Sequence, residues 1–164
     1  MVDVSGYYFI DGIDLWTAFN LFIEKGSADL LQYAPKKDSI THDWQDSNGI
    51  DVDLSRIFLK ERQIILNCAI ITESESDFMA KHDSFLATML QPGTRRLTVT
   101  AHGERSYNVF YKECNGYTQV SSLKGMEDEH LVAMRFSLVL IEPEPEVDSS
   151  LVFIVDEDGR FLVT

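Results

Sequence analysis

The stretch "HLVAMRFSLVLIE", residues 130–142, alternates large apolar side chains with smaller or polar ones. One face of an extended chain would carry Val132, Met134, Phe136, Leu138 and Leu140. Such alternation predicts a β-strand with one face in the core. A second stretch, "RQIILNCAII" at residues 62–71, is apolar on both faces. It predicts a strand that is covered on both sides, by the same chain or by a neighbouring subunit.

Turn-forming dipeptides separate these and other strand-like stretches. Asp11-Gly12, Asn48-Gly49 and Asn115-Gly116 are the residue pairs favoured where both central residues of a hairpin need positive φ. A further reversal is expected near Gly103, after the alternating stretch "RRLTVTA" at residues 95–101. The sequence therefore predicts several antiparallel hairpins.

One segment is patterned as a helix. In "TESESDFMAKHDSFLATMLQPG", residues 72–93, apolar side chains recur at helical spacing and Pro92-Gly93 follows them. Thr72 and Glu75 are spaced as a capping box. We expect a helix of about 15 residues, roughly 22 Å long, with its apolar stripe on a sheet.

These patterns predict a mainly β (α+β) fold, an antiparallel β-sandwich or barrel with one flanking amphipathic helix. We expect one β domain over residues 1–141. The stretch "EPEPEVDSS", residues 142–150, is acidic and contains two prolines, which indicates an extended linker. Residues 151–164 are expected to form a β-hairpin around Asp158-Gly159, which needs a sheet edge to dock on.

The composition narrows the classes of function. The chain has 27 acidic and 14 basic residues, a formal net charge of -13. That balance disfavours direct nucleic-acid binding, which needs clustered Lys and Arg. No apolar run reaches the roughly 18 residues of a membrane span, and "MVDVSGYY" at residues 1–8 has no secretory pattern. We expect a cytoplasmic chain in which Cys68 and Cys114 remain reduced.

No motif of catalysis or metal binding is present. The four histidines are His42, His82, His102 and His130, and no pair has helical metal-ligand spacing. His82 falls on the apolar stripe of the expected helix, which favours a core or interface position. The stretch "DSNGIDVD", residues 46–53, is acidic but lacks the order of a calcium loop. We therefore expect a protein that is not an enzyme and has no cofactor and no metal.

The order of these segments resembles the N-terminal ring domain of the phage distal tail protein family, which has a tail-tube-like fold. The similarity covers residues 7–143. It begins with "FIDGIDL" at residues 9–15 and continues through "FLATMLQPGTRRLTV" at 85–99, "ERSYNVFYKECNGYT" at 104–118 and "LVAMRFSLVLIEP" at 131–143. Its specificity lies in the order of the segments. The chain has "WQDSNG" at residues 44–49, where the family often has a more basic, glycine-rich turn.

The resemblance implies a structural component of a phage or prophage tail, either a distal tail protein or a tube-like connector. It implies a homo-hexameric ring around a channel through which DNA passes without specific binding. The partners would be other tail proteins, namely the tube, the tape measure and the baseplate hub. The protein would be located in the virion tail, and in the bacterial cytoplasm before assembly.

Candidate site residues follow from this interpretation. We expect the apolar segment near the N-terminus to pack the core on one face and a neighbouring subunit on the other, through Ile13, Leu15, Trp16, Phe19 and Phe22. Asp51 and Asp53 are candidates for the channel wall, because a negative surface repels phosphate and lets DNA slide. We expect the strand that carries them to bury Ile50, Val52 and Leu54.

Two other classes of function remain open from the sequence. A β-sandwich that binds a small ligand or carbohydrate could use exposed aromatic side chains such as Trp16, Trp44 and Tyr117. A metal-assisted hydrolase would need His42, Asp43 and the nearby carboxylates to meet around an ion.

Overall fold

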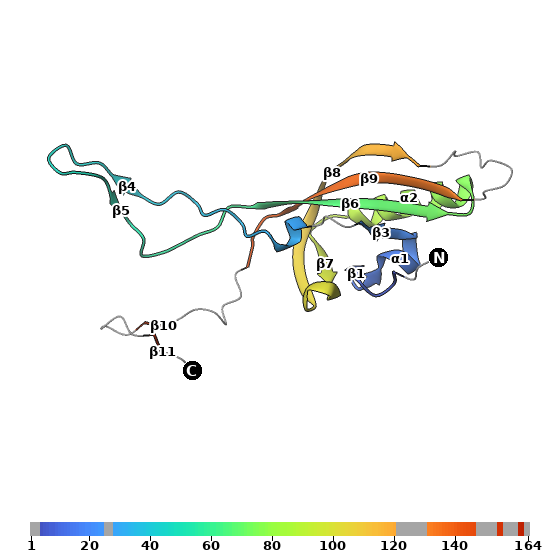
Figure 1. Cartoon of the computed structure of the whole chain (residues 1–164), viewed down its shortest axis with the longest axis horizontal. Coiled ribbons are helices and arrows are strands. Elements are labelled where there is room, and N and C mark those ends of the chain that lie inside the picture. The colour runs from blue at the N-terminus through green and yellow to red at the C-terminus, as the bar shows by residue number, and fades with distance from the viewer. Residues whose placement is uncertain (1–3, 25–27, 121–130, 147–153, 156–160, 163–164) are drawn as a thin grey trace.

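The protein has a β-rich body from which a long two-stranded arm projects (Figure 1). The structure is a computed structural model, and it describes residues 4–24, 28–120, 131–146, 154–155 and 161–162. The chain forms a mainly antiparallel β fold with one long helix, as the sequence predicts.

Seven described strands form one sheet, in the order β2-β1-β7-β8-β9-β6-β3. They are β1 (Tyr8–Ile10), β2 (Ile13–Asp14), β3 (Leu21–Ile23), β6 (Arg62–Thr72), β7 (Arg95–Val99), β8 (Arg105–Gln119) and β9 (Val132–Glu142). All neighbouring pairs are antiparallel. Because β2 and β3 are the two edges, the described strands form an open sheet and not a closed barrel.

Strand β8 lies in the middle of this sheet and connects β2, β1 and β7 on one side to β9, β6 and β3 on the other. Its first residues, Arg105–Val109, pair with β7, and the part from Phe110 onwards pairs with β9. Strands β9 and β6 pair without interruption from Val132 against Thr72 to Glu142 against Arg62. Both parts of the sheet contribute side chains to one buried cluster, which includes Ile10, Leu97 and Val109 with Ile64, Leu66, Ile70 and Leu140.

The expectation that residues 62–71 are covered on both sides is confirmed in part. On one face of β6, Ile64, Leu66, Cys68 and Ile70 are fully buried. On the other face Ala69 is buried, but Ile65 and Ile71 are only half-buried and Asn67 is exposed. The second face is therefore partly open within this chain.

The turn dipeptides have three different outcomes. Asp11-Gly12 makes the expected tight hairpin between β1 and β2, with φ of 51° and 81°. Asn48-Gly49 lies within a longer loop between β4 (Thr41–His42) and β5 (Asp51–Val52), so the hairpin is confirmed and the two-residue turn is wrong. The expected reversal near Gly103 joins β7 to β8.

The hairpin expected at Asn115-Gly116 is wrong. Strand β8 continues through both residues, because Asn115 pairs with Ser137 and Thr118 pairs with Arg135 on the same partner strand. Gly116 has φ of 65° and lies in a bulge between these two pairs. A glycine with positive φ serves a β-bulge as well as a turn, so the dipeptide alone does not decide between them.

A short helix interrupts the N-terminal strand pattern. Helix α1 (Leu15–Phe19) follows β2, and the carboxylate of Asp14 caps it by accepting a hydrogen bond from the backbone N–H of Thr17 at 2.8 Å. Asn20 ends the helix with φ of 51°. The expectation of alternating faces is therefore wrong here, because residues 15 and 19 lie on one helix face.

The long helix α2 (Glu75–Met89) has the expected position and length of 15 residues. It packs Phe78, Phe85 and Met89 into the core, and Phe85 contacts Phe19 of α1 with 5.6 Å between ring centroids. The expected capping box of Thr72 and Glu75 is wrong. Thr72 ends β6, and Ser74 is the N-cap, accepting from the backbone N–H of Asp77 at 3.2 Å.

Replacing Ser74 by alanine is expected to lower the free energy of unfolding by about 1 kcal/mol, because the backbone N–H of Asp77 loses its hydrogen-bond acceptor. Urea denaturation of Ser74→Ala and Ser84→Ala tests this. Ser84 is exposed inside the helix, away from the cap, and is the matched control. Equal losses for the two variants would contradict the assignment of the cap.

The remaining described elements are short. They are η1 (Ala28–Leu31), η2 (Thr100–His102), β10 (Ile154–Val155) and β11 (Phe161–Leu162). Strands β10 and β11 pair with each other, which confirms a C-terminal hairpin. Its expected turn at Asp158-Gly159 lies outside the described residues. The boundaries 1–141, 142–150 and 151–164 remain a prediction, although β9 continues through Glu142.

Candidate assembly surfaces

The arm, residues 33–60, leaves the body after η1 and returns at β6 (Figure 1). Hydrogen bonds connect its two sides near the base. The Lys37 N–H donates to the Phe58 carbonyl at 2.7 Å, and the Lys60 N–H donates to the Pro35 carbonyl at 2.8 Å. Further out, β4 and β5 pair with each other. The arm is therefore an ordered two-stranded extension.

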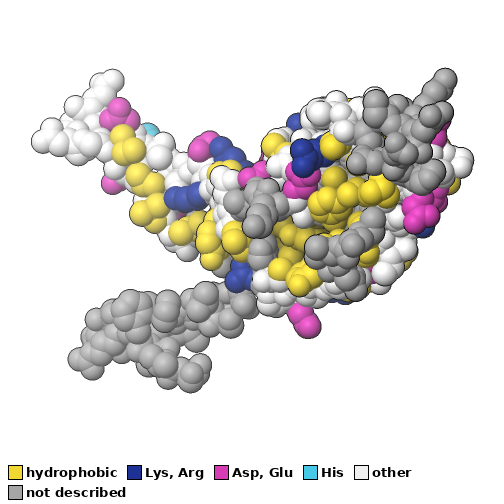
Figure 2. Space-filling model, turned by 45° about the vertical axis from the view of Figure 1, so that its right-hand side comes forward, with side chains coloured by type: hydrophobic (Ala, Val, Ile, Leu, Met, Phe, Trp, Pro, Cys, Tyr) yellow, Lys and Arg dark blue, Asp and Glu magenta, His cyan; other side chains and the backbone are white. Residues whose placement is uncertain are grey.

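Large apolar side chains on the arm are exposed to solvent (Figure 2). The expected burial of Ile50, Val52 and Leu54 is wrong for this chain, because they are 60%, 39% and 61% exposed. Others on the arm are Tyr33, Ile40, Trp44, Ile57 and Phe58. The alternating pattern identified a strand with one apolar face, but the body does not cover that face. A contiguous apolar surface of this kind is typical of an interaction site.

The charges of the arm divide along its length. The proximal half, next to the body, carries Lys36, Lys37, Arg56 and Lys60 against Asp38, with Glu61 following at the base of the arm. In the distal half, the charged side chains are all carboxylates, those of Asp43, Asp46, Asp51 and Asp53. The proximal half is therefore basic and the distal half acidic.

A buried ion pair anchors the base of the arm. Arg62, the first residue of β6, donates from Nε to Glu142 Oε2 at 2.7 Å, and the two side chains are 11% and 7% exposed. The Arg62 guanidinium also donates to the Gln32 carbonyl and lies over the Tyr107 ring, 5.1 Å from its centroid. The Tyr107 hydroxyl in turn donates to the Leu30 carbonyl at 3.0 Å.

This cluster joins three parts of the chain. Gln32 precedes the arm, Arg62 follows it, and Glu142 ends β9. Burial raises the pKa of Glu142 above its ordinary value, although the neighbouring Arg62 charge opposes that shift. The cluster therefore holds both ends of the arm against the body.

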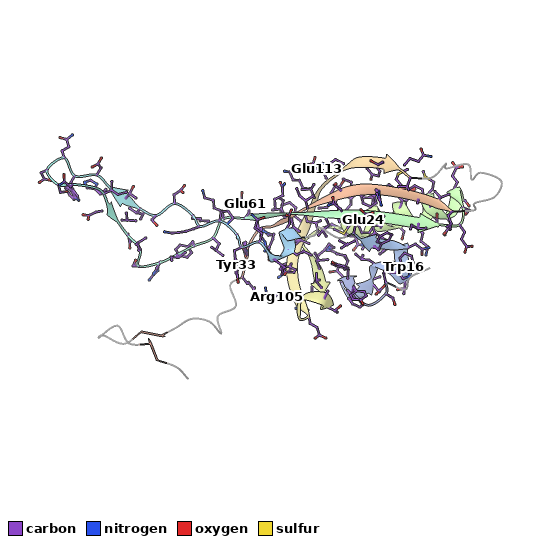
Figure 3. The ribbon with its side chains drawn as sticks, in the orientation of Figure 1. Trp16, Glu24, Tyr33, Glu61, Arg105 and Glu113 are labelled. Carbon is purple, nitrogen blue, oxygen red and sulfur yellow. The ribbon has the colours of Figure 1, made fainter. Side chains whose placement is uncertain are left out.

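A small apolar pocket, the Trp16 pocket, lies on another part of the body. Its cavity volume is about 110 Å³, and its walls include Val4, Tyr7, Tyr8, Leu15, Trp16, Leu21, Phe22 and Ile23. Trp16 and Phe22 meet edge to face, with ring centroids 6.1 Å apart. In Figure 3, Trp16 lies on the far side of the body from Tyr33 and Glu61 at the base of the arm.

The structure separates the five expected interface residues into two groups. Leu15 and Phe19 are 2% and 4% exposed and belong to the core of this chain. Ile13 is 44% exposed, and Trp16 and Phe22 are half-buried at the Trp16 pocket. Only these three have surface to offer a neighbouring subunit.

Asp51 and Asp53 are both exposed and lie on the distal arm. Asp51 accepts a hydrogen bond from Trp44 Nε1 at 2.9 Å. Asp53 accepts hydrogen bonds from Ser55, which hold the pKa of its carboxyl below the ordinary value. Both positions suit a charged surface, and their place on a channel wall remains a prediction.

The aromatic side chains considered for sugar binding do not share one surface. Trp44 lies on the arm, Trp16 at its pocket, and Tyr117 packs on Phe136 with ring centroids 5.3 Å apart. Tyr117 also meets His82 Nε2 at 3.1 Å. The His82 ring stacks on Phe78, so this histidine lies at the edge of the core, as expected.

Within the described residues, no group of three His, Cys, Asp or Glu side chains is placed to hold a metal ion. The His42 ring meets the Trp44 ring edge to face, with ring centroids 3.9 Å apart. Cys68 and Cys114 are free thiols, and burial raises the pKa of both. None of the helices in this part of the chain is long and apolar enough to cross a membrane.

Comparison with known proteins yields a likeness of fold. No family model matches the chain, and no curated protein matches it. Among solved structures, the fold is similar to that of the Dit protein of phage SPP1, described as a paradigm of the hub adsorption apparatus in phages that infect Gram-positive bacteria. The TM-score is 0.55 at 13% sequence identity. The match covers 88% of this chain and 54% of the SPP1 protein, so the chain spans about half the length of that neighbour.

Proposed function

We propose that this protein is a structural, non-enzymatic component of a phage or prophage tail that assembles into a homo-hexameric ring. The fold likeness to a phage hub protein supports this proposal. So does the order of sequence segments that resembles distal tail proteins. Its partners would be further copies of itself and other tail proteins, and it would be located in the virion tail.

One observation carries the proposal. The arm holds its apolar side chains away from the body, with Ile40, Ile57 and Phe58 between 61% and 79% exposed. Exposed apolar area is unfavourable in water by roughly 25 cal/mol for each Å². An ordered, anchored extension with such a surface fits a part that another chain covers. Rings satisfy this need, because each subunit covers its neighbour.

The acidic distal arm fits a surface along which DNA slides. In the proposed ring, Asp51 and Asp53 face the channel, and their carboxylates repel the phosphate backbone. DNA then passes without specific binding. A map of the ring that places these residues on its outer rim would contradict this part of the proposal.

Light scattering over a range of protein concentrations tests the assembly directly. We expect a species of six times the 18.7 kDa chain mass, and negative-stain images with a central hole. In the proposed structural role, contacts between protein surfaces hold the particle together and a bound metal ion does not. Chelators should therefore leave the particle mass unchanged. A monomer at every concentration, with no ring in the images, would contradict the proposed homo-hexamer.

A further inference from the structure

Two separate two-stranded sheets leave the body at the same place. Among the described strands, β4 pairs with β5 in the arm, and β10 pairs with β11 in the C-terminal hairpin. The arm returns to the body at Arg62, and the C-terminal segment, residues 143–164, follows Glu142. Because Arg62 Nε and Glu142 Oε2 are 2.7 Å apart, the arm and the C-terminal segment share one attachment point. A two-stranded hairpin alone is marginally stable in water, so each sheet needs another surface to pack on.

We propose that the C-terminal hairpin, residues 151–164, packs within its own chain against the apolar side chains near the base of the arm. These side chains belong to Ile57 and Phe58 on the returning side and to Tyr33 on the outgoing side, and they are 64%, 61% and 77% exposed. The hairpin has matching apolar side chains at residues 151–155 and 161–163. Contact between the two surfaces removes apolar area of both from water.

The linker is long enough for this contact. Residues 143–150 span at most about 27 Å when extended. Ile57 is three residues from Lys60 at the base of the arm, which is at most about 10 Å. Leu151 can therefore reach Ile57 while the ion pair at the base stays intact. A short tether also gives the hairpin an effective concentration on the order of 1 mM at the arm, which favours contact within one chain over contact between chains at micromolar protein concentrations.

The charges favour the proximal half of the arm as the docking surface. This half is basic, and within the described residues neither Lys37 nor Arg56 forms an ion pair with a carboxylate. The C-terminal segment is acidic, because Arg160 is opposed by the carboxylates of Glu144, Glu146, Asp148, Asp156, Glu157 and Asp158. Exposed charge pairs contribute little energy, but they decide where two surfaces meet. The carboxylates of the distal half repel the same segment.

The contact goes beyond the proposed function and is compatible with the ring. Ile40, Ile50 and Val52 of the arm are 79%, 60% and 39% exposed, and the proposed docking surface does not include them. These side chains stay available to a neighbouring subunit. The C-terminal hairpin and the neighbour then cover different parts of one arm.

Photo-cross-linking in the whole 164-residue chain tests the contact. A benzophenone amino acid replaces Phe58, and mass spectrometry identifies the residues to which it becomes attached. The same amino acid at Tyr7 is the matched control, because Tyr7 is an aromatic residue, 50% exposed, at the Trp16 pocket on the other side of the body. An equimolar mixture of isotope-labelled and unlabelled chains separates links within one chain from links between chains. We expect position 58 to link to residues 151–164 of the same chain, with a yield on the order of 10-fold above that from position 7.

Charge-reversal variants test the placement on the basic half. Lys37→Glu combined with Arg56→Glu is expected to lower the yield of the internal link on the order of 10-fold, because attraction becomes repulsion. Glu146→Lys combined with Asp148→Lys should restore the yield in that background. Arg96→Glu is the matched control and should leave the yield unchanged, because Arg96 is exposed on β7 of the body. Circular dichroism melting curves confirm that each variant is folded.

The outcomes separate this inference from the proposed function. Internal links from position 58 to residues 151–164, lowered by charge reversal and restored by the second pair of changes, would support the contact. Links between chains only, no link to this segment, or a yield that charge reversal leaves unchanged would overturn it. Light scattering of the same samples tests the homo-hexamer separately. A monomer with the internal link would contradict the ring and keep this contact, and a ring without the link would do the reverse.

Discussion

Replacing Phe19 by aspartate is expected to unfold the protein, whereas the same change at Trp16 is expected to leave it folded. Phe19 is 4% exposed and packs against Phe85 of α2. Truncation of a buried Phe alone costs about 3–5 kcal/mol, and a buried unpaired carboxylate adds to that cost. The total stability of a domain is about 5–15 kcal/mol. Trp16 is half-buried, so its aspartate can reach water.

Circular dichroism and urea denaturation of both variants measure this difference. Ile13→Asp is a suitable control, because Ile13 is 44% exposed on β2 and carries the same added charge. A cooperative transition for Phe19→Asp close to that of the natural chain would contradict the core assignment. The comparison also decides whether a loss of assembly at these positions is a loss of fold.

Replacing Arg62 by alanine is expected to lower the free energy of unfolding by about 3 kcal/mol at neutral pH. The change leaves the Glu142 carboxylate buried, with 7% of its side chain exposed, and without its cation. It also removes the hydrogen bond to Gln32 and the contact with the Tyr107 ring. The base of the arm therefore loses its link to the body.

The penalty should depend on pH. The folded-state pKa of Glu142 is raised above its unfolded value, so the native state binds this proton more readily. Binding of this proton therefore stabilises the folded state at low pH. This contribution to the free energy of unfolding is lost as the pH rises from the unfolded-state pKa through the folded-state pKa. Without Arg62 the folded pKa rises further. The loss in Arg62→Ala should therefore be largest near neutral pH and smaller near about pH 5.

A double-mutant cycle isolates this effect. Glu142→Gln cannot ionise, so the Arg62→Ala and Glu142→Gln double variant should show no such pH dependence. Urea denaturation of the four proteins at both pH values gives the coupling between the two side chains. An Arg62→Ala penalty that is the same at both pH values would contradict the role of the buried carboxylate.

Much of the fold could be predicted from local patterns. The strand at 132–142, the doubly apolar strand at 62–72 and the helix at 75–89 have the expected places, because their periodicity repeats over three or more turns or pleats. Two of the predictions that failed depend on one or two residues. Asn115-Gly116 suits a bulge as well as a turn, and Ser74 replaces Thr72 as the cap because β6 uses Thr72 as its last residue.

Helix α1 had a sequence signal that strand alternation obscured. Asp14 precedes Leu15 and Phe19, which are four residues apart, and this is the spacing of an N-capped helix with one buried face. A helix so short has little intrinsic stability and forms because the core receives its two apolar side chains. Tertiary packing decided its structure, and with it which interface candidates remained on the surface.

By itself the sequence determined which side chains must be shielded from water and which segments are strands or helix. The spacing of the apolar residues indicates both. It identified Ile50, Val52 and Leu54 as one apolar face. Only the tertiary structure decided that the body does not cover this face and that the arm carries it into solvent. Periodicity shows that an apolar face avoids water, but the chain that covers it is set by long-range packing, which local spacing does not encode.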